Sequence, residues 1–201
     1  MNERKFPVKI STVCMKKPRL EVYYPKVSGC ESGVAEKRIN DQILHLVNQM
    51  IRDQGYYDNP QTDITAYYEL KTNERGLLSL TLSNYAFSGG AHGITLLKAL
   101  TFDVETGYNY ELKQLFSPYS NYIKVLSDMI KVQIKEREIP LIVDFNQIRP
   151  DQDYYLADKC LVVYFQQYEL APYAYGFPQF PISLYDLQDI LAEDPLQRML
   201  Y

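Results

Sequence analysis

The sequence predicts an α+β protein made of two small subdomains, each an antiparallel sheet with packed helices. Two segments repeat apolar residues at steps of three and four, which is typical of helices with one buried face. Around them, short alternating or β-branched runs are separated by turn residues, which is typical of strands. Of the 201 residues, 46% are hydrophobic and 23% are charged, so the chain can bury a core.

Two short strands and a helix are predicted at the start of the chain. Val8–Val13 and Arg19–Tyr24 are rich in β-branched and aromatic residues, and Pro25 is expected to end the second strand. Residues 31–52 follow as a helix, which ends before the turn residues that begin at Gly55. The apolar stripe of this helix consists of Ile39, Ile43, Leu46, Val47 and Met50, and His45 falls on the opposite face.

A three-stranded antiparallel meander is predicted after this helix. Residues 62–71 alternate between apolar and polar side chains, the pattern of a strand with one buried face. Residues 78–83 and 94–102 repeat the pattern, and the loops between the three segments are short enough for antiparallel neighbours. The third strand is expected to end at the tight turn Glu105-Thr106-Gly107.

The second half of the chain predicts a helix and a second set of strands. Residues 121–135 carry an apolar stripe of Ile123, Leu126, Ile130 and Ile134. Residues 154–157 and 160–170 form a hairpin, and apolar residues on both faces of its second strand indicate a central strand. A short strand over residues 180–184 and a short helix over residues 185–191 complete the fold.

The charge and cysteine content exclude several classes of protein. With 21 Lys and Arg residues against 25 Asp and Glu residues, the chain lacks the basic field that attracts nucleic acid or anionic membranes. It has no apolar run of about 18 residues and no hydrophobic segment after its charged N-terminus, so we expect no membrane insertion, no signal peptide and a cytoplasmic location. Cys14, Cys30 and Cys160 form no CxxC pair; they are free thiols, or Cys14 and Cys30 form a disulfide.

Three stretches resemble one known family, in matching order and spacing. They are Ser88-Gly89-Gly90-Ala91-His92-Gly93, then Thr101–Gly107 with Leu112 and Leu115-Phe116, and then Tyr164–Gly176. These stretches resemble the RsiV-like C-terminal domain. The preceding part, with Tyr23-Tyr24-Pro25 and a helix before a meander, is similar to the companion domain of PdaC-type proteins. The resemblance places a PdaC-type companion domain at residues 1–95 and an RsiV-like domain at residues 96–201.

The resemblance carries expectations for fold, location and partners. It implies an α+β fold whose second half resembles a subdomain of the heat-shock cognate ATPase without a nucleotide site, and it implies no cofactor. Better understood relatives lie outside the membrane, as the lysozyme-sensing part of an anti-sigma factor or beside a peptidoglycan deacetylase domain. This sequence shows no anchor, sigma-binding segment or deacetylase domain. The family supplies no catalytic residues to carry over.

The segment Ser88–Gly93 is the candidate for chemistry. Ser88 could act as a nucleophile with His92 as its base, provided that a carboxylate such as Asp103 or Glu105 orients the ring. The alternative is a structural hairpin loop in which His92 bonds to the backbone. The sequence lacks the G-x-S-x-G nucleophile elbow, and its two histidines, His45 and His92, do not form a metal motif.

The 19 tyrosines point to recognition more strongly than the histidines point to catalysis. Doublets at 23–24, 56–57, 67–68 and 154–155 place one ring of each pair on either face of a strand, so several rings are expected to be exposed. We therefore predict a non-enzymatic binding or sensing module for a protein or cell-wall glycan, with its ligand-binding residues at Tyr67, Tyr85, Tyr155, Tyr173 and Tyr175. The alternatives are a small hydrolase built on Ser88, His92 and Asp103, and a purely structural domain in which the tyrosines fill the core rim.

Overall fold

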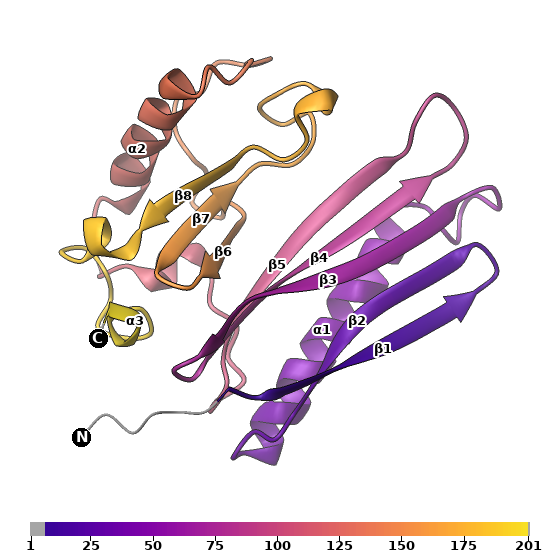
Figure 1. Ribbon diagram of the computed structural model, residues 1–201, viewed down its shortest axis with the longest axis horizontal. Helices are drawn as coiled ribbons and strands as arrows, with labels where there is room; N and C mark the ends of the chain where they lie inside the picture. Colours follow the sequence, from indigo (N-terminus) through magenta and orange to yellow (C-terminus); the bar gives the residue numbers. More distant parts are fainter. Residues whose placement is uncertain (1–6, 201) are drawn as a thin grey trace. The chain divides into compact units, whose positions relative to one another are not determined.

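A computed structural model describes residues 7–200, which divide into two compact units between Asn109 and Tyr110 (Figure 1). Each unit contains one sheet and at least one helix, which confirms the α+β class. The boundary predicted between residues 95 and 96 falls inside a strand, Ile94–Asp103, that is hydrogen-bonded to the first sheet. By their internal contacts the compact units divide after Asn109, whereas the boundary between the two family domains stays a prediction. The resemblance of the second half to an ATPase subdomain stays a prediction.

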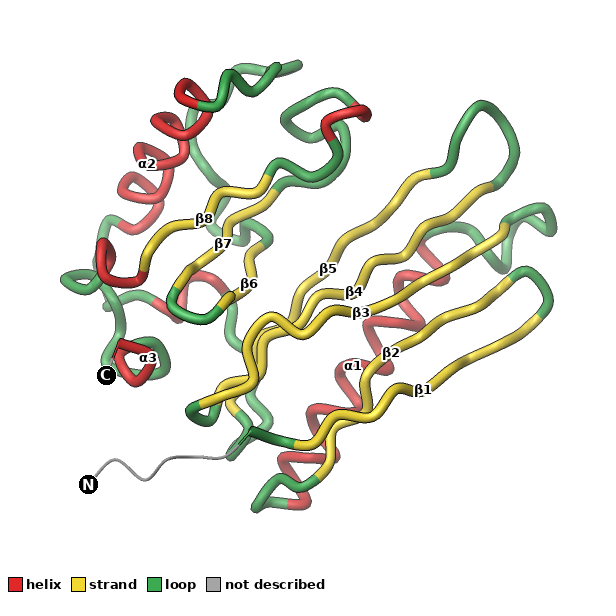
Figure 2. Tube along the Cα trace, in the orientation of Figure 1, coloured by secondary structure: helices red, strands yellow, loops and turns green. Residues whose placement is uncertain are grey.

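The first unit is a five-stranded sheet with one helix lying along one face (Figures 1 and 2). The strands follow one another in chain order across the sheet. The elements are β1 (Lys9–Lys17), β2 (Leu20–Ser28), α1 (Gly33–Asp53), β3 (Asp63–Glu74), β4 (Leu77–Phe87) and β5 (Ile94–Asp103). The meander β3–β4–β5 is antiparallel, as the alternating pattern predicts.

Helix α1 forms where the apolar stripe predicts it. The Ser32 side chain caps its start by accepting a hydrogen bond from the Ala35 N–H at 3.2 Å. The stripe residues Ile39, Ile43 and Val47 are at most 3% exposed, and they pack into the core against the sheet. Each such side chain contributes about 1.5–3 kcal/mol of hydrophobic free energy. His45 is exposed, as predicted.

The first sheet differs from the predicted antiparallel sheet in one pairing. Strands β2 and β3 run parallel, because α1 crosses over between them, and they pair only over Leu20–Val22 and Ile64–Ala66. Pro25 does not end β2; it lies inside that strand and pairs with Thr12. Every second residue of a strand points its backbone nitrogen to the same side. The Val27 N–H points away from β1 and bonds to Asn40, so the nitrogen of Pro25 also points away from β1. On that side β2 no longer pairs with β3, so no hydrogen bond of the sheet is lost at the proline.

Two asparagine side chains pair with backbone groups of the β1–β2 hairpin, one on β2 and one just before β1. Asn40 on α1 accepts the Val27 N–H at 2.8 Å and donates to the Val27 carbonyl at 2.9 Å. Asn73 near the end of β3 makes the same two bonds to Val8, at 3.1 and 2.8 Å. Each amide therefore satisfies both polar groups of one backbone residue and ties the β1–β2 hairpin to the rest of the unit.

Replacing Asn40 with alanine is expected to lower the free energy of unfolding by about 2 kcal/mol, because both polar groups of the buried Val27 lose their partner. Urea denaturation followed by circular dichroism measures the change. Asn48→Ala is the matched control on the same helix, since among residues 7–200 the Asn48 side chain bonds only within α1, to the Leu44 carbonyl. Equal losses for the two variants would show that the amide pairing to β2 contributes nothing.

The second unit is a three-stranded antiparallel sheet with α2 beside it (Figure 1). Its elements are α2 (Tyr122–Glu136), β6 (Tyr154–Ala157), β7 (Cys160–Tyr164), β8 (Gln179–Ser183) and α3 (Gln197–Leu200). Strand β7 is central and its residues Leu161–Tyr164 are buried, as predicted. Gln133 and Arg137 of α2 donate to the carbonyls of Pro181 and Gln179 on β8, at 2.8 and 2.7 Å. The helix expected at residues 185–191 is only a short 3-10 turn, Leu184–Leu187.

The structure also shows the state of the three cysteines. Cys14, Cys30 and Cys160 are free thiols, so the Cys14–Cys30 disulfide that we considered does not form. Burial raises the pKa of the half-buried Cys30 thiol, with Glu36 as a second cause. None of the helices in residues 7–200 is long and apolar enough to cross a bilayer.

Candidate functional site

The segment Ser88–Gly93 forms the loop between β4 and β5, and its side chains are held locally. The Ser88 and Thr62 hydroxyls lie 2.8 Å apart in a hydrogen bond. His92 Nδ1 lies 3.0 Å from the carbonyl oxygen of Gly93, to which it donates in the matching tautomer. Gly93 permits a close contact, since a Cβ added there would lie 2.3 Å from the Ala86 carbonyl and 2.5 Å from the Tyr85 ring.

The structure does not bring Asp103 to Ser88 and His92. Asp103 is the last residue of β5, and the loop precedes Ile94 at the opposite end, so the two places are about 30 Å apart along an extended strand. The Asp103 Oδ1 instead accepts from the backbone N–H groups of Glu105 and Thr106, at 3.0 and 2.9 Å, and from the Thr106 hydroxyl. It holds the turn that follows β5, and Glu105 lies in that same turn.

Replacing His92 with alanine is therefore expected to change the free energy of unfolding by no more than about 0.5 kcal/mol, because the side chain is exposed and its ring bonds to the carbonyl oxygen of the adjacent residue, Gly93. Thermal denaturation beside Ala91→Gly, a change in the same loop, measures it. A loss of several kcal/mol would mark His92 as a structural anchor of the loop.

Two of the predicted ligand-binding tyrosines, Tyr67 and Tyr85, lie on the sheet face opposite α1. Tyr67 on β3 pairs with Ser83, and Tyr85 on β4 pairs with Thr65, so the two rings are on one face and diagonal to each other. Tyr67 is 53% exposed and Tyr85 39%. The Tyr85 hydroxyl accepts the Gly93 N–H at 3.2 Å, so Tyr85 also fixes the loop, whereas the Tyr67 hydroxyl makes no hydrogen bond within residues 7–200.

A third tyrosine of this unit, Tyr23 on β2, is also exposed. Its hydroxyl donates to Glu21 at 2.6 Å, and this bond raises the pKa of Tyr23 to about 12. The same hydrogen bond, with Lys16 nearby, lowers the pKa of Glu21. The Tyr23 phenol therefore stays protonated throughout the physiological range.

The tyrosines of the second unit divide into buried and half-buried groups. Tyr155 is only 6% exposed and its hydroxyl donates to Gln179 at 2.6 Å, so it is not at the surface where we placed it. Its doublet partner Tyr154 is buried as well, because neither face of β6 is open. Tyr173 and Tyr175 form a 3-10 turn and are half-buried; the Tyr175 hydroxyl accepts from Arg137 at 3.3 Å.

An exposed apolar surface lies beside Tyr173, and the sequence analysis missed it. The Ile142 N–H donates to the Leu170 carbonyl at 3.1 Å, which places residues 141–143 next to the segment that leads to Tyr173. Tyr168, at 48% exposed, has its ring centre 5.6 Å from that of Tyr173. Leu141, Ile142 and Val143 are 39, 46 and 50% exposed. We call these five residues, Leu141–Val143, Tyr168 and Tyr173, the loop surface.

The charge around the loop surface is predominantly negative. Segments 137–153 and 165–176 contain the carboxylates of Glu138, Asp144, Asp151, Asp153 and Glu169 but only the guanidinium groups of Arg137 and Arg149. Arg149 already pairs with Glu169 and Asp151. The two segments that carry the loop surface therefore have a net negative charge, and apolar side chains together with acidic residues favour a partner that is basic and has an apolar contact of its own.

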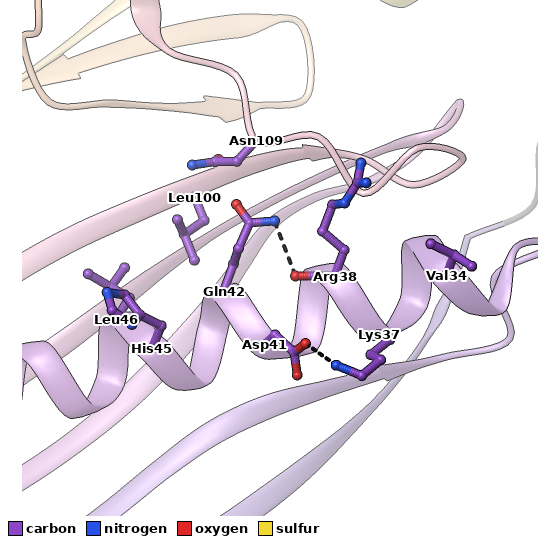
Figure 3. A pocket seen from close by; sticks show the side chains of 9 residues that line it. All are labelled: Val34, Lys37, Arg38, Asp41, Gln42, His45, Leu46, Leu100 and Asn109. Carbon is purple, nitrogen blue, oxygen red and sulfur yellow. Dashed lines mark hydrogen bonds and ion pairs between the residues drawn. The ribbon is translucent and has the colours of Figure 1, made fainter.

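A shallow groove of about 670 Å³ runs along the exposed face of α1 (Figure 3). Leu46 and Leu100 supply apolar wall, while Lys37 and Asp41 form an ion pair at 2.5 Å and Gln42 bonds back to the Arg38 carbonyl. Gln42 and Arg38 also donate to the carbonyls of Gly107 and Thr106, so these polar groups are already paired with the helix or with the turn after β5. Within residues 7–200 no cluster of three or more His, Cys, Asp or Glu side chains could hold a metal ion.

Two known protein families match successive parts of the chain. Residues 11–95 match the family model described as deacetylase PdaC, and residues 113–185 match the model described as a protein of unknown function, DUF3298. The chain thus has an RsiV-like, PdaC-type domain architecture. Among curated proteins it is similar to anti-sigma-V factor RsiV of Bacillus subtilis, with 29% identity over 189 residues. That alignment covers 86% of this chain and 65% of the relative, so the chain spans about two thirds of the relative's length.

Two solved structures share the fold. A DUF3298-family protein of Pseudomonas aeruginosa superimposes with a TM-score of 0.70 at 14% identity, covering 96% of this chain and 97% of the other. A DUF3298-family member from Bacteroides fragilis gives a TM-score of 0.67 at 12% identity, covering 98% and 97% of the two chains. At this identity the similarity establishes the α+β fold.

Proposed function

We propose that this chain is a non-enzymatic binding or sensing module that recognises a protein ligand through the loop surface. The observation that carries the proposal is the exposed cluster of Leu141–Val143 beside Tyr168 and Tyr173. Contiguous exposed apolar and aromatic side chains are typical of recognition surfaces, because rigid rings contribute contact area at low entropic cost. The similarity to an anti-sigma factor supports a sensing role.

The net negative charge of the two segments that carry the loop surface selects the kind of protein. A basic protein of the lysozyme type would approach faster and bind with better complementarity than a neutral or acidic one. This preference predicts that raising the salt concentration weakens binding, since added ions screen exposed charges. Cell-wall glycan is the alternative ligand, to be tested in parallel. The hydrolase alternative needs a carboxylate that orients the His92 ring. Asp103 does not supply it, because it lies at the end of β5 that is farther from His92 and bonds to the turn there.

The test is a titration of the purified chain with lysozyme and, separately, with soluble muropeptides. The double variant Tyr168→Ala/Tyr173→Ala is expected to weaken lysozyme binding at least about tenfold, the loss typical of a central aromatic contact. Tyr119→Ala is the matched control, since Tyr119 is a fully exposed tyrosine of the same unit. Absence of binding by the unmodified chain, or equal binding by both variants, would refute the proposal. Thermal denaturation of each variant checks that the fold is retained.

A further inference from the structure

Asn84 is a polar side chain in the core of the first unit. It lies in the middle of β4, pairs with Ala66 and Leu96, and is 2% exposed. Neither its Oδ1 nor its Nδ2 has a hydrogen-bond partner among residues 7–200. Asn40 and Asn73 in the same unit satisfy both of their amide atoms with backbone groups. A buried amide without partners costs free energy, so something other than these residues must pair with Asn84.

A small cavity lies against Asn84 at the point where β2 and β3 separate. The last parallel pair of that ladder, Val22 with Ala66, lines it, together with Val47 of α1 and Leu82. The space that admits the centre of a water-sized sphere is about 10 Å³. A cavity needs about this much room to hold one water molecule.

The uncharged lining of the cavity favours an uncharged ligand. No Lys, Arg, His, Asp or Glu side chain is among the described residues that line it, and moving an ion into such a site without a partner is strongly unfavourable. The carboxamide of Asn84 offers an acceptor and a donor side by side, which suits a ligand that can donate and accept at once. Size, neutrality and hydrogen-bonding capacity together fit water.

We propose that Asn84 binds one buried water molecule at the junction of β2, β3 and α1, donating to it through Nδ2 and accepting from it through Oδ1. Tyr23 and Tyr67 also line the cavity and are exposed, so the water exchanges with solvent where the β2–β3 ladder ends. This site belongs to the first unit and is independent of the loop surface.

The test combines crystallography with NMR on the full chain. A high-resolution crystal structure is expected to show water within hydrogen-bonding distance of the Asn84 amide, and rotating-frame Overhauser spectra are expected to show a long-lived water signal at the Asn84 side-chain NH₂ group. In Asn84→Leu the bound water should disappear, whereas Asn48→Leu, on the surface of α1, should retain it.

Two results would overturn this proposal. One is a dry Asn84 amide in both measurements on the unmodified chain, a result that requires no variant to fold. The other is a long-lived water that persists at the same place in Asn84→Leu, which would mean that backbone groups hold it without the amide.

Discussion

Replacing Gly107 with alanine is expected to lower the free energy of unfolding of the first unit by about 3 kcal/mol. Two causes act together. Gly107 has φ +69°, in the left-handed region that disfavours a side chain. A Cβ there would also lie 2.7 Å from the Ala35 carbonyl oxygen and 3.1 Å from the Arg38 Cβ, both on α1. The turn would have to withdraw from the helix and lose the bonds from Arg38 to Thr106 and from Gln42 to Gly107.

The control for Gly107 separates backbone strain from steric contact. Gly55 has a similar φ of +76°, but an added Cβ there meets nothing within 4 Å. Gly55→Ala should therefore cost only the conformational term, about 1 kcal/mol. Urea denaturation of both variants measures the difference. If the two losses are equal, the contact between the turn and α1 contributes nothing to stability.

The second large effect is expected at Gly93. Gly93→Ala should cost about 3 kcal/mol, because the added Cβ collides with the Ala86 carbonyl and the Tyr85 ring, and neither can move without disturbing the β4–β5 ladder. Near-ultraviolet circular dichroism should report the displaced tyrosine, and urea denaturation the loss of stability.

Gly33→Ala is the comparison for Gly93, since Gly33 begins α1 with nothing within 4 Å of an added Cβ; it should be neutral or slightly stabilising. A harmless Gly93→Ala would show that the loop readily rearranges.

Local sequence signals predicted the elements whose pattern is long and uninterrupted. Helix α1 has a cap at Ser32 and an apolar stripe over several turns, and the β3–β4–β5 meander has strict alternation. The parallel pairing of β2 with β3 was not predictable in this way, because it depends on how a 21-residue helix crosses the sheet. Pro25 within β2 follows from that same separation of strands, which no local pattern encodes.

The candidate site shows a different limit of sequence reasoning. Ser88, His92 and Asp103 are close in the sequence. The 10 residues of β5 nevertheless separate the loop from Asp103, because an extended strand of this length runs from one end of the sheet to the other. Leu141–Val143 form an unbroken apolar run, which by composition predicts burial; their exposure depends on the loop packing around Leu170. Tyr155 was expected at the surface because doublets alternate faces, yet both faces of β6 are covered.

The bonds from α2 to β8 have a consequence for how the second unit behaves in a crowded solution. The outer edge of a sheet is a template on which another chain can add a strand, and this is a common route to aggregation. Here Gln133 and Arg137 already occupy carbonyls of that edge, and Pro181 has no N–H to offer. The unit can therefore expose an apolar loop surface to a partner while the β8 edge of its sheet resists the addition of another strand.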